Sequence, residues 1–74
     1  MRFVILMEPT ATGFSAHVPD LPGCVAAGET REETVQLIRE AVALHLDAMR
    51  RHGEPIPAPR SISETIEVET PMAP

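Results

Sequence analysis

The chain has 74 residues, enough for one small domain, and eleven acidic residues against six arginines give it a formal net charge of −5 at pH 7. A negative balance opposes contact with phosphates, and two phenylalanines without Trp or Tyr leave few rings for base stacking, so direct nucleic-acid binding is not expected. No stretch approaches transmembrane length and the first apolar run is too short for a signal peptide, so we expect a soluble cytoplasmic protein with no membrane partner.

The N-terminal residues predict a β-hairpin. Residues 2–8 form a continuous, partly β-branched apolar run, which predicts a strand covered on both faces. Residues 9–13 have the composition of a turn, and Phe14 to Val18 then alternate, with Phe14, Ala16 and Val18 on one face. This second segment predicts a half-buried antiparallel strand.

The stretch Pro19-Asp20-Leu21-Pro22-Gly23-Cys24 predicts a tight turn. Proline fixes the second position of a β-turn and glycine accepts a positive φ at the third, which indicates a type II turn from Leu21 to Cys24. Residues 24–28 then predict a short third strand whose small side chains allow another element to pack closely.

A long helix is predicted from Thr30 to His52. The sequence Thr30-Arg31-Glu32-Glu33 has the spacing of a capping box, in which the Thr30 side chain accepts from the Glu33 amide and the Glu33 side chain from the Thr30 amide. Gly53 ends the helical periodicity. Apolar side chains cover an arc of about 200°, roughly twice what packing on one sheet requires. We therefore expect a second covered face and self-association into a dimer or tetramer, with Leu37, Leu44 and His45 as candidate interface residues.

The C-terminal residues predict an extended connection followed by a last strand. Proline at 55, 57 and 59 forces an extended link. Residues 62–69 then alternate, with Ile62, Glu64, Ile66 and Val68 on one face and Ser63, Thr65, Glu67 and Glu69 on the other. Glu67 and Glu69 are candidate residues for binding a cationic partner. The chain is predicted to be one domain over 1–69 with a flexible tail at 70–74, and the element order is β-β-β-α-β, an α+β arrangement with a single helix.

Residues able to carry chemistry are few. Cys24 is the only cysteine, so no disulfide forms within the chain, and a small buried residue is its expected role. His17, His45 and His52 lack metal-ligand spacing. The acids Glu8, Asp20, Glu29 and Glu33 are scattered over strand ends, turns and a cap, which disfavours a two-metal nuclease site. We expect no catalytic residue, no cofactor and no metal. A chain this small, with neither a disulfide nor a metal ion to stabilise it, is expected to rely on association with another copy or with a partner.

Taken together, these motifs resemble the HicB-like antitoxin family. The resemblance rests on Asp20-Leu21-Pro22-Gly23-Cys24, on Gly28 with Thr30-Arg31-Glu32-Glu33, and on Gly53 with Ile56-Pro57 and Pro59; Thr34 stands where an alanine is expected. It covers nearly the whole chain. It implies a partial ribonuclease-H-like β-β-β-α-β fold used for binding rather than cleavage. It also implies a partner, a small basic HicA-like ribonuclease toxin that cleaves mRNA.

Three hypotheses follow for the function. The leading one is a non-enzymatic antitoxin-like module that self-associates and neutralises a basic toxin. The second is an orphan homo-oligomeric structural or regulatory domain without a toxin. The third, a residual metal-dependent nuclease, would require Asp20 for cleavage. The fuller family members carry a C-terminal DNA-binding segment, and operator binding is not carried over to this sequence.

Overall fold

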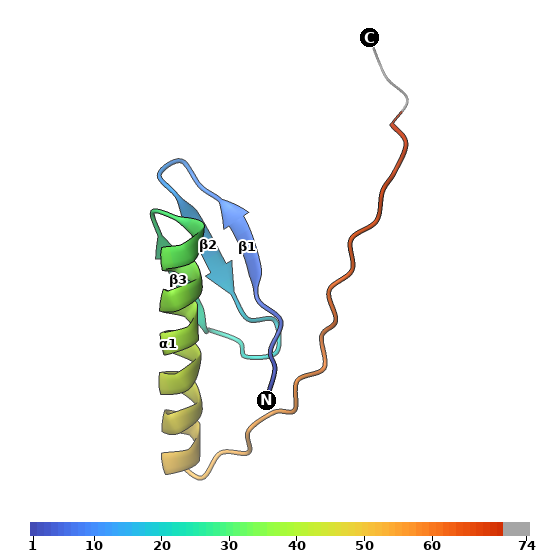
Figure 1. The fold of residues 1–74 in the computed structure, drawn as a ribbon. Helices are drawn as coiled ribbons and strands as arrows, with labels where there is room; N and C mark the ends of the chain where they lie inside the picture. The colour runs from blue at the N-terminus through green and yellow to red at the C-terminus, as the bar shows by residue number, and fades with distance from the viewer. Residues whose placement is uncertain (71–74) are drawn as a thin grey trace.

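The computed structural model describes residues 1–70, so the predicted tail at 70–74 lies, apart from Thr70, outside the described residues. The elements are β1 (Leu6–Pro9), β2 (Phe14–His17), β3 (Val25–Gly28) and α1 (Arg31–Arg51). The strands form one antiparallel sheet in the order β1-β2-β3, and α1 packs across one face of it (Figure 1). The predicted α+β class is confirmed.

The predicted hairpin forms, but its first strand is shorter than expected. Leu6 pairs with His17, and Pro9 pairs with Phe14. Residues 2–5 lie outside β1 because the chain that would pair with them turns away: the Leu21 amide donates to the Val18 carbonyl at 3.0 Å. The N-terminal half of the predicted strand is therefore left without a partner strand.

The predicted type II turn is present at Leu21 to Cys24. The Cys24 amide donates to the Leu21 carbonyl at 3.0 Å, and Gly23 adopts φ 87°, a conformation that favours glycine. Leu21 and Cys24 are both buried, so the turn is anchored in the core and leads directly into β3.

The helix begins and ends almost where the sequence predicts. The Glu33 amide donates to Thr30 Oγ1 at 3.0 Å, as predicted, but Glu33 Oε1 accepts from the Glu29 amide at 2.6 Å rather than from Thr30. At the other end the Glu54 amide donates to the Met49 carbonyl at 2.9 Å and Gly53 adopts φ 70°, the hydrogen bonding of a Schellman motif. Both helix ends are thus satisfied by local groups.

One face of the sheet and one face of α1 enclose the core. Its buried residues are Ala16, Val18, Leu21, Cys24, Thr34 and Ile38. The register places Leu6, His17 and Val25 on the opposite face of the sheet, where all three are exposed. The prediction that the first strand is covered on both faces is wrong for a single copy, because α1 covers only one side.

The predicted last strand does not form within the described chain. Residues 62–69, hereafter the C-terminal arm, are extended and leave the body of the molecule (Figure 1). Ile62, Ile66 and Val68 are 84%, 77% and 68% exposed. The three alternating prolines and the hydrogen bonds described below fix where the arm begins and carry it past the sheet. The fourth strand of the predicted ribonuclease-H-like order is therefore missing from this copy.

Candidate protein-binding site

The root of the C-terminal arm is tied to the turn that precedes β3. The backbone amides of Arg60 and Ser61 each donate to Asp20 Oδ2 at 2.8 Å, and the Ser61 hydroxyl donates to Oδ1 at 2.8 Å. These bonds stabilise the charged carboxylate and lower the pKa of Asp20, with the Ser61 and Arg60 amides as the largest causes. Asp20 thus joins residues forty positions apart and sets the starting point of the arm.

This role of Asp20 is not among those predicted from the sequence. From the sequence, Asp20 is a candidate only as one acid of a metal site and as the first residue of the family motif that ends at Cys24. The signal that would have found it is local: an Asp before a rigid Pro-Gly turn offers two oxygens to a chain that crosses the turn. Proline at 55, 57 and 59 further predicts a crossing chain whose own amides lack partners.

Cys24, Asp20 and Glu33, considered above for catalysis, are either buried or hydrogen-bonded to the backbone of the chain. Cys24 is buried, as predicted, and desolvation raises the pKa of its thiol, which disfavours the reactive thiolate. Among residues 1–70, no three Asp, Glu, His or Cys side chains gather closely enough to hold a metal ion. The Asp20 carboxylate accepts hydrogen bonds from the root of the arm, and the Glu33 carboxylate accepts one from the Glu29 amide just before α1.

The candidate interface residues lie on a flank of α1 that the sheet does not cover. Leu44 is 71% exposed and Leu37 is 38% exposed, seven residues apart on the same side of the helix. His45 is half-buried, and so less exposed than Leu44. Leu37 and Leu44 thus form part of an apolar helix face that the sheet leaves exposed, as expected from the sequence. We call the surface formed by these two residues the α1 flank.

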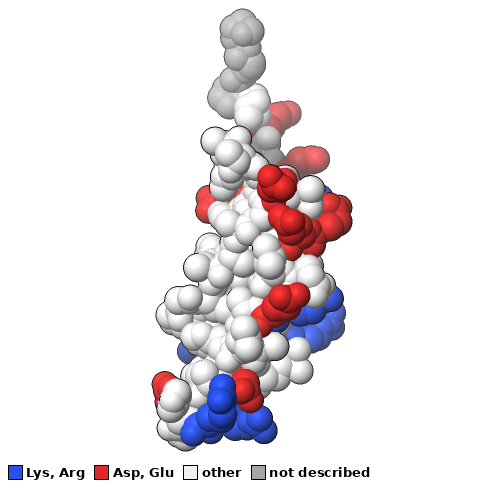
Figure 2. Space-filling model, turned by 90° about the vertical axis from the view of Figure 1, so that its left-hand side faces the viewer, with Lys and Arg blue, Asp and Glu red and all other residues white. Residues whose placement is uncertain are grey.

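Charge is distributed unevenly over the helix side of the molecule. Acidic groups lie around the N-terminal end of α1 and basic groups at its C-terminal end; between them an uncharged surface covers one side of the view, and further acidic and basic groups lie along the other edge (Figure 2). At the basic end, Asp47 pairs with Arg50 at 2.8 Å and with Arg51 at 3.1 Å. Both predicted partner-binding acids, Glu67 and Glu69, lie exposed on the arm rather than on the helix.

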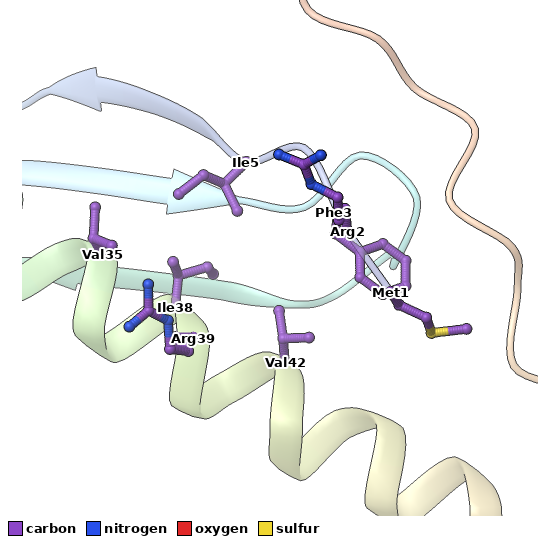
Figure 3. A pocket seen from close by; sticks show the side chains of 8 residues that line it. All are labelled: Met1, Arg2, Phe3, Ile5, Val35, Ile38, Arg39 and Val42. Carbon is purple, nitrogen blue, oxygen red and sulfur yellow. The ribbon is translucent and has the colours of Figure 1, made fainter.

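A groove runs between the N-terminal segment and α1 (Figure 3). Its volume is about 310 Å³, and its lining is largely apolar with one arginine in each wall: Met1, Arg2, Phe3, Ile5, Val35, Ile38, Arg39 and Val42. Arg2 and Arg39 are exposed, and neither pairs with a carboxylate among residues 1–70. No pattern in the sequence predicts this groove, because its two walls come from parts of the chain that only the fold brings together.

In the part of the chain that the structure describes, no helix has the length and apolar character needed to cross a membrane. The helix α1 carries Glu32 and Glu33 in its first turn and Arg50 and Arg51 in its last.

The chain is similar in sequence and in fold to known proteins. A solved structure of a HicA3 and HicB3 toxin-antitoxin complex contains a chain that matches with a TM-score of 0.70 and 33% identity, over 80% of this chain and 70% of that one. A UPF0150 protein of Thermoplasma acidophilum is 32% identical over 92% of this chain and 97% of its own length. Antitoxin HicB 2 of Photorhabdus laumondii is 31% identical over 99% of this chain and 52% of its own length.

The chain thus spans about half the length of some curated relatives and nearly the full length of others. The family model for the HicB_like antitoxin of bacterial toxin-antitoxin systems matches residues 3–71, which include the α1 flank, the C-terminal arm and all of the groove lining except Met1 and Arg2. By this match, supported by the fold that it shares with a chain of the HicA3 and HicB3 complex, the chain belongs to the HicB-like antitoxin family.

Proposed function

We propose that this chain is a non-catalytic antitoxin module that binds and neutralises a small basic mRNA-cleaving toxin of the HicA type. Family membership and the likeness to a chain of a HicA3 and HicB3 complex support this assignment. The observation that carries it in the molecule itself is the C-terminal arm, an extended segment that presents Glu67 and Glu69 to solvent.

The charge of the chain suits such a partner. A net charge of −5 attracts a basic protein over a distance of about one Debye length, roughly 8 Å at physiological salt. Two carboxylates on one face of an extended segment then offer acceptors to lysine or arginine side chains. Capture is expected to be fast and to weaken as salt is added.

Self-association is the second part of the proposal. The α1 flank is an exposed apolar surface in a chain whose small size limits the core it can build. Burying Leu44 and Leu37 against the same flank of a second copy stabilises a symmetric pair, and His45 lies at the margin of that contact.

Co-expression with the small basic protein of the adjacent open reading frame tests the toxin role. We expect the two proteins to co-purify and growth arrest to be relieved. The double variant Glu67→Lys/Glu69→Lys should lose both effects, whereas Glu40→Lys/Glu54→Lys makes the same charge change on and just beyond the helix and should retain them. A partner that neither co-purifies nor is neutralised would contradict the toxin role for that pair.

An orphan homo-oligomeric domain is the second candidate. The observation behind it is that the Thermoplasma acidophilum relative, matched over 97% of its length, is named a UPF0150 protein rather than an antitoxin. Under this alternative the chain still assembles with itself, but no basic neighbour binds to it. The co-expression experiment separates the two candidates, because only the antitoxin requires Glu67 and Glu69.

A further inference from the structure

The C-terminal arm has the pattern of a strand but no strand beside it. Among residues 1–70, none of the bonds between two backbone groups outside the helix and the sheet involves residues 55–70; the Arg60 and Ser61 amides donate to the Asp20 side chain instead. Ile66 and Val68 are exposed on the face that the alternation makes apolar. An apolar, unpaired strand is a liability in solution, and proteins normally pair or cover it.

The groove, in turn, has a wall that is not paired with any strand. Residues 2–5 form one wall without pairing to a strand, and among residues 1–70 they take part in no backbone hydrogen bond outside the sheet. The opposite wall is the part of α1 from Val35 to Val42, beyond the edge strand β1. The missing element is therefore a strand that lies beside residues 2–5 and packs on α1.

The dimensions and charges of the arm suit this position. Val35 and Val42 are about 10 Å apart along the helix axis, which three residues of a strand span. Glu64 interrupts the apolar face formed by Ile62, Ile66 and Val68. A carboxylate carried into an apolar groove needs a cation, and the groove supplies Arg2 from one wall and Arg39 from the other.

The anchor at Asp20 directs the arm away from the groove of its own copy. Because Asp20 holds the Arg60 and Ser61 amides, the arm begins beside the turn before β3. From there the chain passes outside the groove rather than into it (Figure 3). A second copy can receive the arm without any break in this anchor.

We propose that the C-terminal arm of one copy lies in the groove of a second copy, as an added strand beside residues 2–5. Ile66 and Val68 pack on the apolar lining, and Glu64 pairs with Arg39 and Arg2. A two-fold axis makes the exchange reciprocal, so both arms are used and the assembly closes as a dimer. This rests on the self-association part of the proposed function, and it leaves Glu67 and Glu69 on the outer face for a basic partner.

The first test is the mass of the full-length chain, without any toxin, by sedimentation at several concentrations. Replacing one exposed isoleucine of the docking face by a charge, Ile66→Asp, should raise the dimer dissociation constant about a hundredfold. The control Thr65→Asp adds the same charge to the outer face and should change it less than about threefold. Ile66 lies outside the core, so circular dichroism should show both variants folded. A monomeric parent chain, or equal effects of the two changes, would overturn the proposal.

The second test determines whether the arm binds its own copy or another. Arg39→Glu and Glu64→Arg should each weaken the dimer about tenfold or more, because each brings like charges together. An equimolar mixture should recover the dimer, since every arm then meets a groove of opposite charge in the other copy. If the arm closed on its own groove, only the double variant would recover the contact and the mixture would not; that result would also overturn the proposal. Toxin capture is measured separately, so its failure and that of the exchange are distinguishable.

Discussion

The second strand and the C-terminal arm have the same sequence pattern and opposite surroundings. Ala16 in β2 and Val18 just after it alternate with polar residues and are 3% and 2% exposed, whereas Ile66 and Val68 alternate in the same way and lie in solvent. β2 has a neighbour on each side in the sheet, and the arm has none among residues 1–70. Alternation thus encodes an apolar face, but the connections of the chain determine whether that face is covered within one copy.

The largest contrast between the two regions is expected in the stability of the monomer. Ile38 is fully buried between α1 and the sheet, so Ile38→Ala should reduce the free energy of unfolding by about 2–5 kcal/mol. In Ile66→Ala the same atoms are removed from an exposed side chain, and the change should stay within about 0.5 kcal/mol. Urea denaturation at concentrations too low for association provides the measurement. Similar losses for the two variants would mean that the arm is part of the core.

The α1 flank gives the next largest effect, this time on assembly. Leu44→Asp places a charge at the centre of the exposed apolar flank and should weaken self-association there by about 1.5–3 kcal/mol. Arg51→Asp, on the polar side of the same helix, serves as the control. Smaller species should appear in sedimentation for the first variant only, and an unchanged mass would show that the flank is not an interface.

The N-terminal cap of α1 makes a smaller contribution to the free energy of unfolding. Thr30→Ala removes the hydroxyl that accepts from the Glu33 amide and should cost about 1 kcal/mol of stability, while Thr30→Ser should retain most of it. Thermal unfolding compares the three proteins. Because the cap lies at the end of α1 distant from the arm root, the contacts of Asp20 with residues 60 and 61 should be unaffected.

The smallest expected effect is the pH dependence of the arm root. The pKa of Asp20 in the folded chain lies below its ordinary value of 3.8, because the carboxylate accepts from the Ser61 and Arg60 amides. The unfolded chain therefore binds a proton more readily, so the anchor contributes above about pH 4 and is lost as the pH falls through the lowered pKa. The amide resonance of Ser61 should follow this titration. In Asp20→Asn the titration should disappear, and a Ser61 amide that still titrates there would contradict the assignment.

The body of the molecule follows closely from local sequence signals. The Pro22-Gly23 turn, the cap at Thr30 and the stop at Gly53 each satisfy backbone groups within a few residues, so their outcome does not depend on the rest of the fold. The apolar run predicts a strand from residue 2, but β1 begins at Leu6. Its start depends on where β2 ends, at His17, and residues 2–5 carry no information about that end.

The candidate binding site was less predictable for the same reason. The exposed α1 flank follows from counting apolar positions around a helix, and the acids of the arm follow from alternation. The groove and the Asp20 anchor join residues forty or so positions apart. Such contacts form only when the sheet and helix have packed. The Pro-Gly turn after Asp20 and the prolines at 55, 57 and 59 mark the two partners of the anchor, but nothing local indicates that they meet.

Hydrogen exchange of the arm amides over a range of protein concentrations tests the central claim most directly. We predict that amides 62–69 exchange rapidly in dilute solution and become protected as the concentration rises, while amides in the middle of α1 stay protected throughout. Rapid exchange of the arm at every concentration would contradict a partner strand, and protection independent of concentration would place that strand in the same copy.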